Sequence, residues 1–271
     1  KLSWKGKVYL SSSELFVGRV LSKKIENNEI AIVLEGRDLK KNESIRFNLN
    51  SSDKIEGNSI SSVKGLNDIE IDDIISVKNS KIRSVYRSKS NNNFIFATIR
   101  CNSNCLMCSQ PPLDVDDTLE NYLIWNYAIE LLEKCPKHLT ITGGEPTLLG
   151  ERLVLLINKI LEKFPDLLIT ILSNGRLLAL ENTIDTLSSI KLKKNVVFAI
   201  PLYSDVYKIH DHIVQAKDAF HQTCLGIHKI SSLGFLVEIR IVLHKLSNPR
   251  LLSLSKFIHK IYIDIARQFW R

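Results

Sequence analysis

The chain has 271 residues, of which 44% are hydrophobic and 24% are charged, as in a folded globular protein. No apolar run is long enough to span a bilayer, and no apolar segment follows the basic first residues as it would in a signal peptide. The net charge is +8, but the basic residues are spread along the chain, so a membrane is not expected as a partner and nucleic acid is not indicated.

Residues 1–88 carry short β-like runs separated by Asn, Ser, Asp and Gly. These runs cover residues 7–10, 30–34, 74–77 and 82–86. Helical periodicity is weak here, so we expect a small β-rich N-terminal domain whose function the sequence does not indicate. The polar residues 88–93 read as a linker, which places the predicted domains at 1–88 and 89–271.

From residue 93 onward, apolar strand-like runs alternate with helical patterns. Strands are predicted at 94–99, 139–142, 167–172, 196–202 and 235–243, and helices at 117–132, 153–164, 181–190, 219–233 and 249–262. Such alternation is typical of an α/β fold in which right-handed crossovers join parallel strands. The near-continuous apolar strands suit a sheet that helices cover.

The polar residues that could bind a metal or a cofactor follow the ends of these predicted strands. They occupy residues 101–108, 143–145, 173–175 and 203–204, each just after a strand. The carboxyl ends of parallel strands meet at one rim, where the active sites of βα barrels lie. We therefore expect these four segments to form one site.

Five cysteines are present, and three of them share one short loop as Cys101, Cys105 and Cys108. Cys135 and Cys224 stand alone, which makes a poor disulfide framework and suits a reducing cytoplasm. Thiolates are the usual ligands of iron–sulfur clusters, and three of them leave one iron of a four-iron cluster open for a reactive ligand. A structural zinc site would need a fourth ligand, for which Cys135 or His138 could be proposed.

The C-x-x-x-C-x-x-C loop after the first strand, followed by Gly143-Gly144-Glu145-Pro146, resembles the radical SAM superfamily. The resemblance implies a [4Fe–4S] cluster on the three cysteines and a partial (βα)6 barrel. It also implies that the Gly-Gly-Glu motif holds the amino group of S-adenosylmethionine (SAM). Glycines permit close backbone approach and a carboxylate suits an ammonium group. Ser173-Asn174-Gly175 resembles a further cofactor-binding element of that family, although the same residues also suit an ordinary turn.

The resemblance assigns roles to three further positions. Arg240 stands where relatives often place a basic residue near the SAM carboxylate, although a solvated or ion-paired arginine would fit equally well. Met107 occupies the position before the last cysteine, where relatives carry an aromatic residue near the adenine, and methionine is adaptable enough for that contact. His210-Asp211 resembles a pair that is mainly structural in relatives.

The string CNSNCLMCSQPP, together with His210-Asp211 and residues 216–220, resembles a narrower group, the HxsC-type maturases of the His-Xaa-Ser system. This implies a peptide substrate with His-Xaa-Ser repeats and an electron donor such as flavodoxin or ferredoxin. SAM would be cleaved reductively, and the resulting 5′-deoxyadenosyl radical would abstract a hydrogen atom from the substrate. No residue can be named as a general acid or base. Cys135 and Cys224 are too few for a second cluster, and Cys224 fits an apolar helix face.

The family's barrel has six strands, whereas five are found here. We therefore expect a barrel that lacks its C-terminal end, which leaves open a truncated, inactive remnant that only binds a cluster. A radical SAM enzyme acting on a small molecule and a zinc-binding interaction protein also remain as alternatives.

Overall fold

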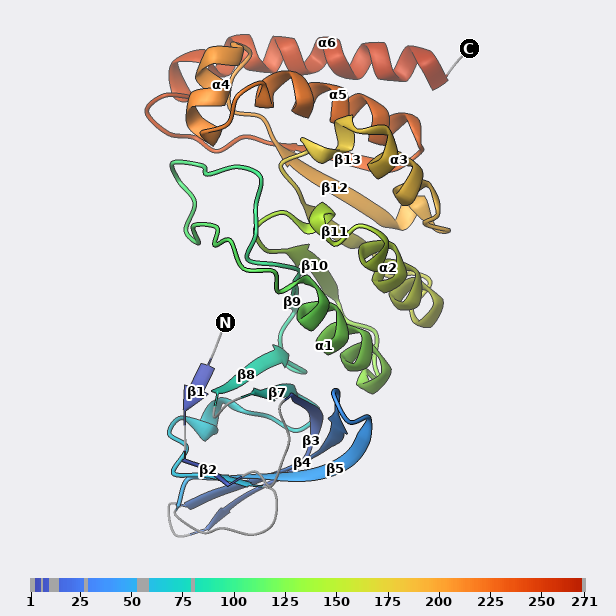
Figure 1. Ribbon diagram of the computed structural model, residues 1–271. Coiled ribbons are helices and arrows are strands. Elements are labelled where there is room, and N and C mark those ends of the chain that lie inside the picture. Colours follow the sequence, from blue (N-terminus) through green and yellow to red (C-terminus); the bar gives the residue numbers. More distant parts are fainter. Residues whose placement is uncertain are drawn as a thin grey trace. The chain divides into compact units, whose positions relative to one another are not determined.

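The computed structural model describes residues 3–5, 7–9, 15–26, 29–52, 59–78 and 81–269, with only the backbone for residues 3–9 and 262–269. The chain divides into two compact units (Figure 1). The β unit consists of Lys1–Phe94 and Leu123–Lys137, and the βα unit of Ile95–Tyr122 and His138–Arg271. A β-rich N-terminal region followed by a parallel α/β sheet is the predicted fold class. The exact domain boundary after residue 88 stays a prediction.

The β unit holds an eight-stranded sheet in the order β1-β8-β7-β3-β4-β5-β6-β2. Its pairs are antiparallel except β5 with β6. Its strands are β1 (Ser3–Lys5), β2 (Lys7–Tyr9), β3 (Phe16–Glu26), β4 (Glu29–Asp38), β5 (Glu43–Asn50), β6 (Ser59–Ser61), β7 (Ile74–Lys78) and β8 (Lys81–Tyr86), with the short helix η1 (Leu66–Asp68) before β7. Sequence patterns located β2, β4, β7 and β8 but missed the other four strands. Strands β1 and β6 have only three residues each, and polar residues interrupt the apolar pattern of β3 and β5.

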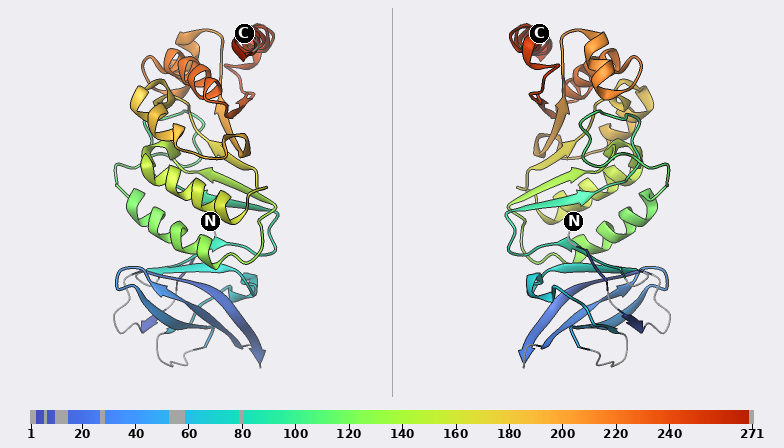
Figure 2. Two further views of the ribbon diagram at one scale, coloured as in Figure 1. Left: turned by 90° about the vertical axis from the view of Figure 1, so that its right-hand side faces the viewer. Right: turned by 90° about the vertical axis from the view of Figure 1, so that its left-hand side faces the viewer.

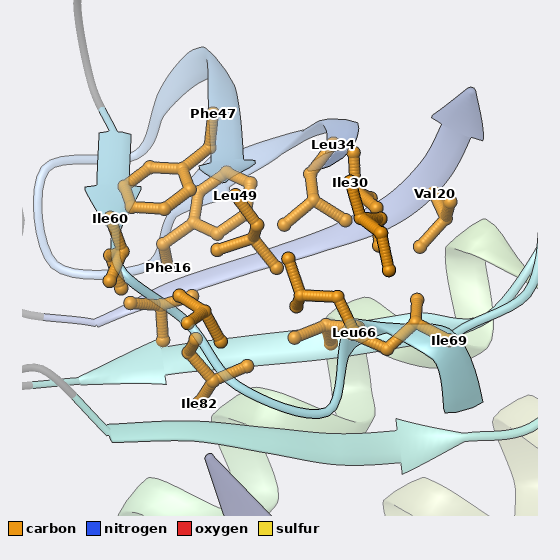
Figure 3. Packing of buried hydrophobic residues seen from close by; sticks show 14 residues of the cluster. Phe16, Val20, Ile30, Leu34, Phe47, Leu49, Ile60, Leu66, Ile69 and Ile82 are labelled. Carbon is orange, nitrogen blue, oxygen red and sulfur yellow. The ribbon is translucent and has the colours of Figure 1, made fainter. Parts of the chain in front are cut away.

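One hydrophobic cluster fills the β unit (Figure 3). Phe16 of β3 stacks on Phe47 of β5, with ring centroids 5.2 Å apart. Along β4 buried and exposed residues alternate, which places Ile30, Ile32 and Leu34 on the inner face of the strand. Burial of these side chains stabilises the unit, because apolar area leaves water.

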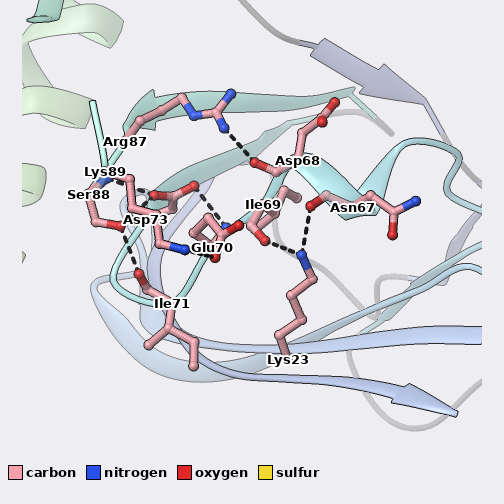
Figure 4. A network of polar contacts seen from close by, with 10 residues as sticks. All are labelled: Lys23, Asn67, Asp68, Ile69, Glu70, Ile71, Asp73, Arg87, Ser88 and Lys89. Carbon is pink, nitrogen blue, oxygen red and sulfur yellow. Dashed lines mark hydrogen bonds and ion pairs between the residues drawn. The ribbon is translucent and has the colours of Figure 1, made fainter. Parts of the chain in front are cut away.

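Residues 67–73 of the β unit are held by polar contacts from both sides (Figure 4). Lys23 Nζ donates to the carbonyls of Asn67 and Ile69 at 2.7 Å each. The Asp73 carboxylate accepts from the backbone N–H of Glu70 at 3.1 Å and from that of Ser88 at 2.7 Å. These bonds fix the segment that leads into β7 and tie it to the residues after β8.

The C-terminal part of helix α1 (Thr118–Leu131) and the residues after it belong to the β unit. The Arg37 guanidinium lies 4.9 Å from the centroid of the Tyr127 ring, a cation–π contact. Arg19 forms an ion pair with Glu133. The β sheet thus binds this helix by charge as well as by packing.

The described part of the βα unit holds five strands in the order β13-β12-β11-β10-β9. The pairs from β10 to β13 are parallel, as the alternation predicted. The strands are β9 (Asn92–Phe96), β10 (His138–Thr142), β11 (Ile169–Leu172), β12 (Val196–Pro201) and β13 (Leu236–Arg240). Helices α2 (Glu151–Lys163) and α3 (Glu181–Ser188) lie on one face of this sheet (Figure 2).

The remaining helices of the unit follow the later strands. They are α4 (Tyr207–Val214), α5 (Ala219–Ser232) and α6 (Leu251–Phe269), with the short helices η2 (Pro146–Leu149), η3 (Leu177–Ala179), η4 (Lys193–Asn195) and η5 (Asn248–Arg250). Sequence analysis missed α4, because eight residues give too few turns for a periodic signal. It also ended α6 too early. Cys224 of α5 packs against Leu202, Phe220 and Leu254, and burial raises the pKa of its thiol to about 11.

Candidate functional site

The cysteine loop lies directly after β9, the first strand of the βα unit. Two of its backbone N–H groups are anchored on the end of α4, since Asn104 donates to Val214 at 3.1 Å and Leu106 to Ile213 at 2.9 Å. Within the loop, the N–H of Cys108 donates to the carbonyl of Cys105 at 3.0 Å. The missed helix α4 is therefore part of the scaffold that shapes this loop.

The three thiols are free and lie close enough to influence one another. The pKa of Cys105 is raised to about 11, chiefly by burial and also by the charges of Cys101 and Cys108. Burial also raises the pKa of Cys101. A cation or a metal cluster placed among the three sulfurs would reverse this effect, because positive charge favours the thiolate form.

The donor set of the loop consists of three thiols, the ligand type that iron–sulfur clusters take. Among the described residues, no three His, Cys, Asp or Glu side chains are gathered to hold one metal ion. That finding gives no support to the zinc alternative, in which Cys135 or His138 would complete a compact set of four ligands. A [4Fe–4S] cluster instead takes each thiolate on a different iron, so the sulfurs of Cys101, Cys105 and Cys108 need not converge on one point.

Gly143 and Gly144 bring the end of β10 against the start of the cysteine loop. The N–H of Gly144 donates to the Thr98 carbonyl at 2.7 Å, and that of Glu145 donates to the Arg100 carbonyl at 2.8 Å. Gly143 has a φ of 147°, and a Cβ on Gly144 would stand 1.9 Å from the Arg100 carbonyl oxygen. Only residues without a Cβ allow this approach, which explains the two glycines before Glu145.

The Glu145 carboxylate is fully buried and connects two strand ends. Its Oε1 accepts from the Thr147 N–H at 3.1 Å, the Thr147 hydroxyl at 2.6 Å and the Ser173 hydroxyl at 2.8 Å. Its Oε2 accepts from the Asn174 N–H at 2.8 Å. Burial raises the pKa of Glu145, while these hydrogen bonds oppose the rise. Pro146, also buried, opens η2 directly after it.

Asn174, which is hydrogen-bonded to Glu145, also contacts the cysteine loop. Its Nδ2 lies 3.7 Å from Cys101 Sγ and donates to Asn102 Oδ1 at 2.6 Å, while its Oδ1 accepts from the Arg176 N–H at 3.0 Å. The structure thus joins three sequence-predicted segments, the cysteine loop, the Gly-Gly-Glu motif and residues 173–175, in one hydrogen-bonded network.

Arg176 is a residue of this network that sequence analysis missed. Its guanidinium binds the Asn102 carbonyl and donates to the Ser103 hydroxyl at 3.1 Å, while Nε donates to Gln222 Oε1 at 2.7 Å. Its positive charge also favours the thiolate of Cys105. The signal available in the sequence was its position directly after Ser173-Asn174-Gly175.

Two predicted site residues lie apart from the network formed by the described hydrogen bonds. Arg240, at the end of β13, is exposed and its Nε pairs with Glu238 Oε1 at 2.7 Å on the same strand. This is the ion-paired arrangement that the sequence left open for Arg240. Met107 is exposed beside Leu106 in the cysteine loop, so its predicted contact with adenine stays a prediction.

His210 and Asp211 hold neighbouring segments together. His210 Nδ1 accepts from the Tyr203 N–H at 3.4 Å, and Asp211 Oδ1 accepts from the Phe220 N–H at the start of α5 at 2.8 Å. Burial lowers the pKa of His210 to about 4, so its imidazole is neutral near pH 7. The geometry therefore gives the pair a structural role.

Residues 95–255 match the family model of the radical SAM superfamily. Among solved structures, the chain is similar to Streptococcus suis SuiB bound to S-adenosylmethionine, with 16% identity and a TM-score of 0.49 over 63% of this chain and 38% of SuiB. It is also similar to native anSMEcpe with bound AdoMet and Cp18Cys peptide, with 21% identity and a TM-score of 0.37 over 54% of this chain and 41% of anSMEcpe. The chain thus spans less than half the length of either protein.

No curated protein matches the chain. In the part of the chain that the structure describes, no helix has the length and apolarity required to cross a membrane.

Proposed function

Because the chain belongs to the radical SAM superfamily, we propose that Cys101, Cys105 and Cys108 hold a [4Fe–4S] cluster beside a SAM site at the Gly143-Gly144-Glu145 motif. Members of the superfamily are enzymes that use a [4Fe–4S] cluster and SAM, and these are the cofactors of this chain. Together, the two cofactors supply reductive cleavage of SAM and an organic radical that removes a hydrogen atom from the substrate.

One observation carries this proposal: the hydrogen-bonded path from Glu145 through Asn174 to Cys101. Through this one residue, Asn174, the predicted amine-binding motif is connected to a predicted cluster ligand, which supports the proposal. Since all four Glu145 hydrogen bonds run to protein groups, the carboxylate acts chiefly by fixing the loops and supplying negative charge. Contact with the SAM amino group would then fall partly to the backbone carbonyls of the motif.

The protein residues tune the cluster site in three ways. The Asn174 amide faces Cys101 Sγ, and N–H groups that face sulfur stabilise its negative charge. Arg176 adds positive charge beside the loop and fixes its backbone. Cys105 packs against a buried cluster that contains Tyr203, Ile213, Val214 and Ala219, which limits its access to water. Restricted solvent around a cluster influences its reduction potential.

We further propose that the substrate is a peptide with His-Xaa-Ser repeats and that the chain acts as an HxsC-type maturase in a reducing, cytoplasmic compartment. The support is the string from Cys101 to Pro112 together with His210, Asp211 and residues 216–220. His210 and Asp211 fix the α4 region against which the cysteine loop is anchored. An external one-electron donor such as flavodoxin or ferredoxin would be required.

The cofactor proposal is tested by anaerobic cluster reconstitution and a dithionite-driven assay for 5′-deoxyadenosine. We expect product from the parent and from Cys135→Ala, whose thiol lies outside the loop, but none from Cys105→Ala. The iron and sulfide content should likewise be retained in Cys135→Ala and reduced in Cys105→Ala. If Cys105→Ala retains the parent's iron and activity, the proposed ligand set is wrong.

The substrate proposal needs a separate assay. The reconstituted parent is incubated with SAM, reductant and a synthetic peptide carrying His-Xaa-Ser repeats, and the peptide mass is compared with that of a peptide of the same composition in scrambled order. A mass change confined to the repeat peptide supports the maturase proposal. Production of deoxyadenosine without any peptide modification favours a different substrate, such as a small molecule.

A further inference from the structure

Helix α5 packs against the turn that follows β11, and two glycines make this contact close. A Cβ on Gly226 of α5 would stand 2.2 Å from the Gly175 carbonyl oxygen and 2.9 Å from Leu178 Cβ. Gly175 itself has a φ of 78°, in the left-handed region that favours glycine. Any side chain at position 226 would therefore push α5 away from residues 174–176.

Two consecutive side chains of α5 bind this turn. The hydroxyl of Thr223, which is buried, donates to the Asn174 carbonyl at 3.0 Å. The side-chain oxygen of Gln222 accepts from Arg176 Nε at 2.7 Å. Asn174 and Arg176 are the two residues of the turn whose side chains bind the cysteine loop. Each of them therefore has its own partner on α5.

The Gln222 contact fixes the plane of the Arg176 guanidinium. An arginine side chain has many rotamers, and its planar fork meets a given set of acceptors in only one orientation. With Nε held by Gln222, Nη1 faces the Asn102 carbonyl and the Ser103 hydroxyl of the cysteine loop. Because glutamine is neutral, it orients Arg176 without neutralising the positive charge.

The Thr223 contact fixes the backbone from which the Asn174 side chain projects. The Asn174 N–H donates to Glu145 at 2.8 Å and its carbonyl accepts from Thr223 at 3.0 Å, so both backbone polar groups are bound. In this position Asn174 Nδ2 donates to Asn102 Oδ1 at 2.6 Å and lies 3.7 Å from Cys101 Sγ. The direction of this amide thus depends on α5 as well as on Glu145.

Helix α5 also supports the other side of the cysteine loop. The N–H of Phe220, at the start of α5, donates to Asp211 Oδ1 of α4 at 2.8 Å. The end of α4 in turn accepts two N–H groups of the loop, at the carbonyls of Ile213 and Val214. Cys105 packs against the cluster that contains both of these residues. The two supports of the loop are therefore both bound to one helix.

We propose that Gln222 and Thr223 are positioning residues of the cluster site, which act on the cysteine loop through Arg176 and Asn174. The inference rests on the proposed cluster and is independent of the peptide substrate. Gln222 orients a positive charge and Thr223 orients an amide dipole that faces sulfur. Net charge and hydrogen bonds to sulfur both influence the reduction potential of an iron–sulfur cluster. The two residues therefore influence how firmly the cluster is held and how easily it is reduced.

Matched substitutions separate these contacts from helix packing. Thr223→Val removes the hydroxyl but keeps the shape, Thr223→Ser keeps the hydroxyl, and Gln222→Leu removes the acceptor for Arg176 Nε. Thr186→Val is the control, because the hydroxyl of Thr186 bonds to the Asn182 carbonyl within α3. Iron release to a chelator is followed anaerobically for each reconstituted chain, and thermal midpoints identify the variants that fold normally.

We expect Gln222→Leu and Thr223→Val to release iron about fivefold faster than the parent or more, as for the loss of one hydrogen bond. Thr223→Ser and Thr186→Val should stay within about twofold of the parent. Parent rates in both Gln222→Leu and Thr223→Val overturn the proposal. A Thr223→Ser variant as fast as Thr223→Val overturns it for Thr223, because the hydroxyl would then not matter.

A double variant shows whether Gln222 acts through Arg176. The variant that combines Arg176→Gln with Gln222→Leu should release iron no faster than Arg176→Gln alone, because the second change removes a contact that is already lost. Rates that multiply would mean that Gln222 acts by another route. A parent that takes up no iron refutes the proposed function and this inference with it, whereas a loaded parent with unaffected variants overturns this inference alone.

The reduction potential gives a readout that a purely structural role would not change. Gln222→Glu keeps an acceptor for Arg176 Nε but adds a negative charge beside the guanidinium. In a redox titration, the potential of the cluster should therefore move to more negative values, while iron release stays near the parent rate. An unchanged potential overturns the electrostatic part of the proposal. If Gln222→Leu does not fold, Gln222→Glu and the two Thr223 variants provide the test.

Discussion

The backbone N–H of Asn174 and Oε2 of Glu145 lie 2.8 Å apart, in a hydrogen bond that joins the loops after two neighbouring parallel strands. The Asn174 side chain in turn faces Cys101 Sγ. A buried carboxylate at the end of β10 thus sets the position of an amide that contacts the cysteine loop. Preorganised hydrogen bonds of this kind reduce the reorganisation needed when a ligand binds.

Replacing Glu145 by Gln should destabilise the chain by about 1–3 kcal/mol, because an NH₂ group would face donors that now meet a carboxylate oxygen. SAM affinity should fall as well, since the negative charge is lost. Urea unfolding and equilibrium dialysis measure the two effects. The matched control is Glu151→Gln on the exposed first turn of α2, where we expect a change within about 0.5 kcal/mol. Equal effects at both positions would contradict the assigned role.

Replacing Gly144 by Ala should prevent the close approach of β10 to the cysteine loop. The new Cβ would stand 1.9 Å from the Arg100 carbonyl oxygen, so we expect a loss of about 3 kcal/mol in unfolding free energy. Iron content after reconstitution should drop with it. Gly234→Ala is the control: it has a φ of 89° but nothing within 4 Å of the new Cβ, so it should cost only about 1–2 kcal/mol of backbone strain. Normal cluster loading in Gly144→Ala would disprove the packing argument.

Replacing Arg176 by Gln should loosen the cysteine loop while leaving most of the fold intact, because its bonds run to Asn102 and Ser103 of that loop. We expect the reconstituted cluster to be lost several-fold faster in the presence of a chelator. Arg176→Lys keeps the charge but not the planar fork, so it should fall between parent and Gln. Iron release followed over time decides the order. Identical rates in all three proteins would show that Arg176 does not hold the loop.

The buried His210 predicts a pH dependence of stability. Its pKa is lowered by burial from 6.5 to about 4, so between these values the unfolded chain binds a proton that the folded chain does not. Its contribution is therefore complete above pH 6.5 and is lost as the pH falls towards 4, by about 2–3 kcal/mol. His210→Asn keeps an acceptor for the Tyr203 N–H but does not titrate.

The measurement for His210 is the unfolding free energy of parent and Asn variant across this pH window. The stability advantage of the parent should shrink by about 2–3 kcal/mol from neutral pH to the lower end. A difference that stays constant with pH would mean that His210 does not titrate between the folded and unfolded states.

Local patterns in the sequence were sufficient to predict most of the βα unit and to propose the cluster ligands. Cysteine spacing within one loop and a Gly-Gly-Glu turn depend on residues near each other in the chain. The five strands of the sheet lie in or beside short, mostly apolar runs. Helix α4 and strands β1, β3, β5 and β6 were not recognised. The helix is short, and along β5 only Phe47 and Leu49 are fully buried, so neither gives a clear period.

The contacts that complete the site join residues far apart in the sequence, so only the folded structure reveals them. Arg176 reaches the carbonyl of Asn102 across 74 residues, and Glu145 meets Ser173 across 28. The register of parallel strands brings these loops to one rim, and a side chain's partners there are set by neighbouring strands rather than by neighbours in sequence. Residue type and spacing therefore indicate the chemistry, whereas burial and strand register decide that Glu145 is bound by protein groups and that Arg240 faces solvent.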